Sequence, residues 1–336
     1  MITSRIENEK LFFCTLFDIN YLSRGLSLYD SLMQNAKNFS LYVLAMDDIC
    51  YAKLISLKLS NMIVVSLNEF ENEELKIAKS NRSRVEYFWT SAAAFILHVL
   101  KNFDVNMCAY LDSDVYFFSD PQIIFQEVNK QEDKSVLIIN HNFHQEYDIS
   151  EKVGTYNISI VAFMNCNSAL EVLEEWCQKC LDWCYDCFEE AGKYGNQKYL
   201  DEWPKRYRCV YISANPGGGL APWNAKRFPI ENDTPLHIID LKNGNKYPFI
   251  FFHFHSMTFF DKDVVRLANQ EYYIDEQYRR KIYGKYLRKL NEVIKKYSLA
   301  NHETHFYAAQ HFRDDVSTLV NDRNYYRLSS FEHGSS

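Results

Sequence analysis

Glycine and proline are both scarce in this chain of 336 residues, which has 10 glycines and 7 prolines. This scarcity, and the lack of any repeated motif, exclude collagen-like, low-complexity and repeat architectures. No apolar run approaches the length of about 20 residues that a membrane-spanning helix needs. The first ten residues are polar and lack the apolar segment of a signal peptide. We therefore expect a globular cytoplasmic protein whose nine cysteines remain reduced.

Positive charge is also in deficit. The net charge is −7 at pH 7, which argues against a general nucleic-acid-binding protein. The exception is the stretch from Arg279 to Lys296, where Lys and Arg are interleaved with tyrosines and leucines. Such a stretch fits either a solvated helix face or a surface that attaches to an anionic membrane. Both interpretations stay open.

Short apolar runs alternate with segments of helical spacing. The sequence predicts strands at 10–17, 41–45, 62–67, 108–111, 135–140, 156–164, 209–212 and 248–254, and helices at 21–33, 50–59, 84–100, 122–128 and 167–190. This alternation is typical of an α/β fold with a mostly parallel sheet. We expect this domain to cover residues 1–262, followed by a basic helical C-terminal extension over 263–336.

Asp112 and Asp114 interrupt an apolar run that begins at Cys108 and resumes at Val115. Two carboxylates at the point where a central strand leaves the sheet can hold a divalent cation against phosphates, because hard cations prefer oxygen ligands. Open α/β sheets bind their ligands at this carboxyl edge. The alternative is that the aspartates only cap a turn.

His253 and His255 follow the last apolar run, and either could complete the shell of such a metal. From strand alternation we expect one of them to point into the crevice and the other away. The alternative for each is a purely structural histidine.

Four cysteines, Cys177, Cys180, Cys184 and Cys187, have the paired spacing of a zinc or iron–sulfur site. We expect instead one helix from Asn167 to Glu190 that carries all four on one face. They would then span about 15 Å at about 1.5 Å per residue, too far for one tetrahedral ion. We therefore predict that they pack in the core as small apolar side chains; a metal site would require the helix to be broken.

Three consecutive glycines at 217–219 lack the Lys-Ser/Thr that follows in phosphate-binding loops. We expect a mobile loop that allows close backbone approach. Trp223 beside it fits either a core residue or a stacking platform for a sugar ring.

Four segments together resemble nucleotide-sugar glycosyltransferases of the GT-A fold, and most of all family 8, which includes glycogenin and bacterial lipooligosaccharide galactosyltransferases. They are residues 17–21, 111–114, 156–159 and 195–197. Residues 198–204 and 219–224 are more similar to a bacterial surface-polysaccharide branch. The resemblance covers residues 10–260 and implies a Rossmann-like, mostly parallel sheet flanked by helices.

The resemblance also implies an activity. A sugar would pass from a nucleoside-diphosphate sugar, in the first place a UDP-sugar, to a glycan or lipid-linked saccharide of lipopolysaccharide or capsule at the inner face of the membrane. Asp112 and Asp114, with His253 as third ligand or His255 in its place, would hold Mn²⁺ or Mg²⁺, which neutralises the departing diphosphate. Asp18 and Asn20 would contact the base and ribose. The implied donor site is Leu16, Phe17, Asp18, Asn20, Tyr21, Arg84, Ser113, Asn157, Trp223 and Asn224.

The implied catalytic set is Asn196, Gln197 and Asp201, with Asn157 and Gln197 beside the anomeric carbon. We expect retention, because the departing phosphate can accept the proton of the acceptor. Inversion would require a carboxylate base, for which Asp201, Glu202 and Glu86 are the candidates.

Three departures from the family pattern bear on donor identity and activity. Asn196 stands where the family has aspartate. The usual arginine before the aspartate pair is missing unless Arg82 or Arg84 serves, and the usual lysine after the histidines is missing unless Lys262 serves.

Two other functions fit parts of the sequence. The Asp-x-Asp-Val motif at residue 112 is also typical of haloacid-dehalogenase-like phosphatases, although there it opens the fold. The other function is binding of a nucleotide sugar without transfer, which the replacement of the usual aspartate by Asn196 suggests. Turnover of an aryl phosphate would indicate the former, and hydrolysis of a nucleotide sugar would exclude the latter.

Overall fold

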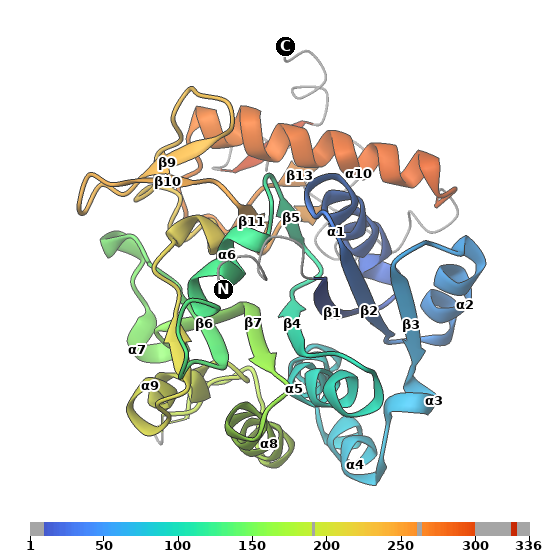
Figure 1. Cartoon of the computed structure of the whole chain (residues 1–336). Coiled ribbons are helices and arrows are strands. Elements are labelled where there is room, and N and C mark those ends of the chain that lie inside the picture. Colours follow the sequence, from blue (N-terminus) through green and yellow to red (C-terminus); the bar gives the residue numbers. More distant parts are fainter. Residues whose placement is uncertain (1–9, 190–191, 261–263, 300–323, 328–336) are drawn as a thin grey trace.

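The computed structural model describes residues 10–189, 192–260, 264–299 and 324–327. In this part of the chain the fold is α/β, with a mainly parallel seven-stranded sheet flanked by helices (Figure 1). The strand order is β3-β2-β1-β4-β7-β6-β8, and only β7 runs antiparallel to its neighbours. The strands are β1 (Leu11–Phe17), β2 (Phe39–Ala45), β3 (Met62–Ser66), β4 (Met107–Leu111), β6 (Val136–Asn140), β7 (Tyr156–Met164) and β8 (Val210–Ile212). The predicted α/β class and mostly parallel sheet are confirmed.

Helices cover both faces of the sheet, so alternate strand residues enter two different cores. Phe13 and Phe17 of β1 pack with α1 (Leu22–Asn35), α6 (Gln122–Val128) and α10 (Gly284–Lys296). Cys14 and Leu16 pack on the opposite side, with α5 (Arg84–Asn102) and α8 (Asn167–Asp182). Burial on both faces explains why the strands are almost continuously apolar.

The remaining helices are short or peripheral. They are α2 (Asp48–Leu57), α3 (Leu67–Phe70), α4 (Glu73–Asn81), α7 (Ser150–Val153) and α9 (Trp203–Arg206), with short 3₁₀ segments η1 (Ile19–Tyr21), η2 (Gln145–Tyr147), η3 (Lys198–Glu202) and η4 (Pro216–Gly218). A π-helix, η5 (Tyr278–Tyr283), leads directly into α10. In the described residues no helix is both long enough and apolar enough to cross a bilayer.

A third core lies beside the carboxyl edge of the sheet. Its buried aromatics, which include Phe252, Phe254, Tyr278, Tyr283 and Tyr286, join residues 216–260 to residues 264–299. The predicted domain boundary between 262 and 263 lies outside the described residues. Small antiparallel sheets surround this core: β5 (Val115–Phe117) with β11 (Phe251–His253), β9 (His237–Ile239) with β10 (Lys246–Pro248), and β12 (Thr258–Phe259), β13 (Val264–Arg266) and β14 (Tyr325–Arg327). The strand predicted at 248–254 is confirmed only in part: β11 covers residues 251–253, and Pro248 ends β10 instead.

The helix predicted to continue to Glu190 is also wrong, because α8 ends at Asp182 and Trp183 is extended. Arg82 binds the exposed end of α8, donating to the backbone oxygens of Cys180 and Leu181 at 3.1 and 2.7 Å. Core packing is confirmed for Cys177, Cys180 and Cys184, but Cys187 is exposed.

The triple glycine is buried: Gly217 and Gly218 belong to η4, and Gly219 follows it as the C-cap. A side chain at Gly217 would collide with the backbone oxygen of Pro248, so the predicted close backbone approach is confirmed.

The basic C-terminal stretch is partly used inside the molecule. Asp30 of α1 is buried, and its carboxylate accepts from Lys296 at 2.8 Å and from the Tyr297 hydroxyl at 2.7 Å. Lys289 lies 3.8 Å from the other oxygen of Asp30. One side of α10 therefore binds α1.

Candidate active site

Asp112 and Asp114 lie in the turn that joins β4 to β5. The backbone N–H of Asp112 donates to Ser159 of β7 at 3.2 Å, and Val115 donates back to Asp112 at 3.2 Å. Because β1 and β4 are parallel, the turn lies at the same edge as the end of β1. This is the carboxyl edge at which the sequence predicts the acidic pair.

Pairing of β5 with β11 brings His253 to the same place, opposite Val115. The His253 Nε2 atom lies 3.1 Å from Asp114 Oδ1 and 3.7 Å from Asp112 Oδ2. Burial alone would raise the pKa of Asp114, but the charge and hydrogen bond of His253 lower it. Burial raises the pKa of Asp112 in spite of the opposing charge of His253. Burial would lower the pKa of His253, and the two carboxylates raise it instead.

A cavity of about 510 Å³ contains these three side chains. The predicted residues that line it are Leu16, Phe17, Tyr21, Arg84, Asp112, Ser113, Asp114, Asn157, Asn196, Gln197, Trp223, His253 and His255. His253 and His255 both face the cavity, so the expectation that one of them points away is wrong. Residues i and i+2 of an extended chain share a face, which is the physical reason.

Arg84, at the start of α5, reaches the cavity because buried Asp18 forms an ion pair with it. Asp18 also accepts from the backbone and side-chain nitrogens of Asn20, at 3.0 and 3.2 Å. Neither Asp18 nor Asn20 lines the cavity itself. Of the two arginines considered for the missing family position, Arg84 is at the cavity and Arg82 at the end of α8.

Two amides lie together on the wall formed by β7 and the segment before η3. Asn157 Nδ2 donates to Gln197 Oε1 at 3.5 Å and lies 3.1 Å from His141 Nε2. Burial lowers the pKa of His141 to about 3, so its ring is neutral and can accept. Gln197 in turn donates to the backbone oxygen of Val153 at 2.9 Å. The pair therefore presents fixed amide groups to the cavity.

Asn196 is held from both sides. Its side-chain nitrogen donates to the backbone oxygen of Trp89 at 2.9 Å, and its own backbone oxygen accepts from Trp176 at 2.8 Å. Gly195 precedes it with φ +49, and an added Cβ there would lie 3.2 Å from the Trp89 ring.

The three candidate bases are occupied elsewhere and do not line the cavity. Asp201 accepts from the Thr155 N–H at 2.7 Å and pairs with Lys198. Glu202 pairs with Lys205. Glu86 caps its own helix and accepts from the Asp186 N–H at 2.8 Å.

Trp223 combines the two roles that the sequence left open, since it is buried in the third core and still lines the cavity. Its ring meets those of His253 and His255 edge-on, with centroids 5.5 and 5.4 Å apart. Asn224 is fully buried and donates to the backbone oxygens of His141 and Gly219, so it supports the wall and does not line the cavity.

Several lining residues were missed by the sequence analysis, above all His141, Phe143, Trp89 and Glu271. His141 and Phe143 follow β6, whose end lies at the same sheet edge, so the edge rule could have found them. Glu271 comes from an irregular segment after β13 and carries no pattern that would single it out.

Comparison with known proteins places the chain among its relatives. No family model matches the sequence. Among solved structures it is similar to mouse xyloside xylosyltransferase 1 (8% identity, 74% of this chain and 98% of that one, TM-score 0.48). It is also similar to the galactosyltransferase LgtC in complex with donor and acceptor sugar analogs (12% identity, 73% and 87%, TM-score 0.48).

Two proteins of Bacillus subtilis (strain 168) are similar in sequence. The uncharacterized protein YfnD is 30% identical over 289 residues, which cover 84% of this chain and 89% of YfnD. The uncharacterized protein YfnF is 30% identical over 250 residues, which cover 72% of this chain and 80% of YfnF. At this identity and coverage, the chain belongs to the same family as YfnD and YfnF.

Proposed function

We propose that the chain is a glycosyltransferase that transfers a sugar from a UDP-sugar or another nucleoside-diphosphate sugar to a glycan of the bacterial surface, with Mn²⁺ or Mg²⁺. One observation carries the proposal: Asp112, Asp114 and His253 converge in a cavity at the carboxyl edge of the sheet, beside the amides of Asn157 and Gln197. Acidic groups for a cation and neutral amides for sugar hydroxyls are then combined in one place.

Two of the three donor groups fit a hard divalent cation, since carboxylates suit Mg²⁺ and Mn²⁺, and His253 would add an imidazole nitrogen. His253 Nδ1 is buried and has no hydrogen-bond partner among the described residues. As the side chains stand, however, the described residues contain no set of three His, Cys, Asp or Glu groups that could hold a metal alone. Diphosphate oxygens would therefore supply further ligands, and we expect metal and donor to bind together. The bound cation would supply positive charge against the departing diphosphate.

The remaining side chains position the donor and shape the cavity. Arg84, oriented by Asp18, would pair with the negative charge of the donor. Asn157 and Gln197 would hold the hydroxyls of the transferred sugar, because amides both donate and accept. Trp223 and His255 would close the opposite wall against water.

We propose retention, because Asp201, Glu202 and Glu86 do not line the cavity; Glu271, which does, is the carboxylate by which this proposal is tested below. Membrane attachment is not part of the proposed function, because two basic residues of the 279–296 stretch, Lys289 and Lys296, are bound to Asp30.

A thermal-shift screen with nucleotide sugars tests the metal assignment. UDP-sugars, GDP-sugars and dTDP-sugars are added with and without Mn²⁺, and ligand binding at a hundredfold excess over Kd should stabilise the protein by about 2.7 kcal/mol. Asp114→Ala should lose this metal-dependent shift and all transfer while it keeps the wild-type circular dichroism spectrum. Asp104→Ala is the matched control, because Asp104 is an exposed carboxylate that precedes the first residue of β4, at the edge of the sheet away from the cavity. Unchanged turnover in Asp114→Ala, or rapid turnover of p-nitrophenyl phosphate by the wild type, would contradict the proposal.

A further inference from the structure

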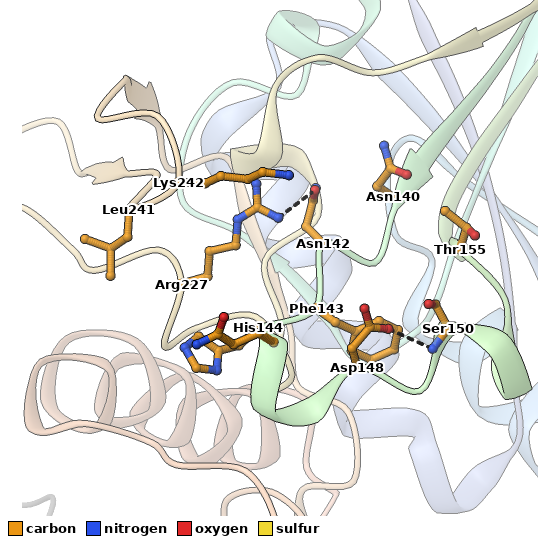
Figure 2. A pocket seen from close by; sticks show the side chains of 11 residues that line it. Asn140, Asn142, Phe143, His144, Asp148, Ser150, Thr155, Arg227, Leu241 and Lys242 are labelled. Carbon is orange, nitrogen blue, oxygen red and sulfur yellow. Dashed lines mark hydrogen bonds between the residues drawn. The ribbon is translucent and has the colours of Figure 1, made fainter.

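A second cavity, of about 600 Å³, opens beside the first at the same edge of the sheet. Figure 2 shows Arg227, Lys242 and Leu241 on one side of it, and Asn140, Thr155 and Ser150 on the other. Phe143, His144, Gln145, Asp148 and Asn142 complete the lining. Its volume is in the range of small-molecule sites, which is about 300–1,000 Å³.

The rigid parts of the chain build this cavity. Asn140 ends β6 and Thr155 precedes β7, and the N–H of His141 donates to Thr155 at 2.9 Å. The opposite wall depends on Arg227, which binds Asp240 through two parallel hydrogen bonds of 3.0 and 2.9 Å. The same guanidinium reaches Asn142 Oδ1 at 3.4 Å (Figure 2). The β9–β10 hairpin, which carries Leu241 and Lys242, is thereby fixed to the loop after β6.

Phe143 is part of the wall of both cavities. On the side of the first cavity, the His141 ring stacks on it, with centroids 4.7 Å apart and planes inclined by 14°. Trp223 packs behind His141 at 5.3 Å. A ligand that crosses Phe143 would therefore reach from the second cavity toward Asn157 and Gln197, which lie in the first.

The polar groups of the second cavity match hydroxyl groups. The side-chain amides of Asn140 and Gln145 form no hydrogen bond with any described residue, and each can both donate and accept. Ser150 adds a hydroxyl, and Phe143 adds an aromatic face on which the C–H side of a sugar ring can pack.

The charges of the lining indicate a neutral ligand. Arg227 is already compensated by Asp240. What remains is one carboxylate, Asp148, and one ammonium, Lys242, whose signs cancel. A phosphate or a uronic acid would meet Asp148 without an excess of positive charge to hold it.

We propose that the second cavity binds an uncharged sugar unit of an oligosaccharide acceptor, next to the unit that reacts in the first cavity, with Phe143 as the surface between them. This inference rests on the proposed function. It adds that the acceptor is an oligosaccharide and that its recognition is separate from donor binding.

A glycan array tests the proposal with the full chain. The array carries neutral tri- and tetrasaccharides of glucose, galactose, rhamnose and N-acetylglucosamine, together with their uronic-acid and phosphorylated counterparts. We expect the wild type to bind neutral members. Asn140→Ala, and Gln145→Trp at an exposed position, should each weaken this binding at least about tenfold, which corresponds to about 1.4 kcal/mol. Glu146→Ala is the control, because Glu146 lies on the same turn and does not line the cavity.

Donor hydrolysis separates this test from that of the proposed function. Hydrolysis of a nucleotide sugar by water needs no acceptor, so both variants should hydrolyse it at the wild-type rate. If the wild type neither binds nor hydrolyses any of the nucleotide sugars, the proposed function fails and the acceptor role of the second cavity fails with it, whereas normal hydrolysis without glycan binding overturns this inference alone. Absence of neutral glycan binding, binding confined to anionic members, or equal binding by all variants would overturn the inference.

Discussion

Asn196 shows why an amide occupies a position where an aspartate is expected. Its Nδ2 atom donates to the backbone oxygen of Trp89, and a carboxylate cannot donate there. We therefore expect Asn196→Asp to lower the free energy of unfolding by about 1–3 kcal/mol, because two acceptors would face each other in a partly buried place. The measurement is urea denaturation.

Asn165→Asp is a matched control, because Asn165 donates to the backbone oxygens of Leu100 and Val105 at the opposite end of the sheet. Asn165→Asp should lower the free energy of unfolding by a similar amount and still bind the donor. Asn196→Asp should both lower the free energy of unfolding and weaken donor binding. Higher activity of Asn196→Asp at unchanged stability would mean instead that Asn196 replaces a functional carboxylate.

Glu271 is the carboxylate that lines the first cavity apart from Asp112 and Asp114, among the described residues. If the enzyme retains configuration, Glu271 has no proton to remove, and Glu271→Gln should keep kcat within about threefold of the wild type. A general base contributes about 10²–10⁴-fold, so a loss of that size would assign Glu271 as base. The second measurement is NMR of the anomeric configuration of the product, made with the donor that the thermal-shift screen identifies. An inverted product would contradict retention.

At the scale of elements, the backbone before Gln197 depends on a glycine. Gly195 has positive φ and faces the Trp89 ring, whereas Gly244 in the β9–β10 hairpin has φ +75 with open space around its Cβ position. Alanine at either site should cost about 1–2 kcal/mol of stability for the left-handed backbone. Only Gly195→Ala should also lower transfer, because crowding against Trp89 would shift Asn196 and Gln197. Equal activity of the two variants would argue against the role of this segment.

The elements that local pattern determines were predictable, and those that depend on distant partners were not. Asp112 and Asp114 directly follow their own strand, so the sequence predicted correctly at which edge of the sheet they lie. The sequence offered His253 and His255 as alternative partners of this pair, and only the β5–β11 pairing, which no local signal reveals, brings His253 beside the two carboxylates. The end of α8 depends on Arg82, about a hundred positions away in the sequence, which satisfies the last helical oxygens. The second cavity depends likewise on the Arg227–Asp240 pair and its contact with Asn142.

At the scale of the whole molecule, Asp30 connects α1, near the start of the described chain, to α10, more than 250 residues later. Asp30→Ala removes a buried carboxylate and leaves Lys289, whose side chain is 14% exposed, without it. We expect the free energy of unfolding to fall by about 2–3 kcal/mol. Breaking a fully buried ion pair costs about 3–5 kcal/mol, and the loss is smaller here because Lys296 is half exposed. Urea denaturation measures the loss of stability. Glu292→Ala is the control, because Glu292 is an exposed partner of the same Lys289. Equal stability of the two variants would contradict the role of Asp30.

The joining of α1 to α10 has a consequence for synthesis. A chain leaves the ribosome from its N-terminus, so α1 emerges long before Lys289, Lys296 and Tyr297 exist to cover Asp30. The nascent protein must therefore carry the carboxylate of Asp30 uncovered until Lys296 and Tyr297 have emerged. A premature stop before residue 289 would release a chain in which Asp30 never gains these partners, and we expect cellular quality control to degrade it as incompletely folded.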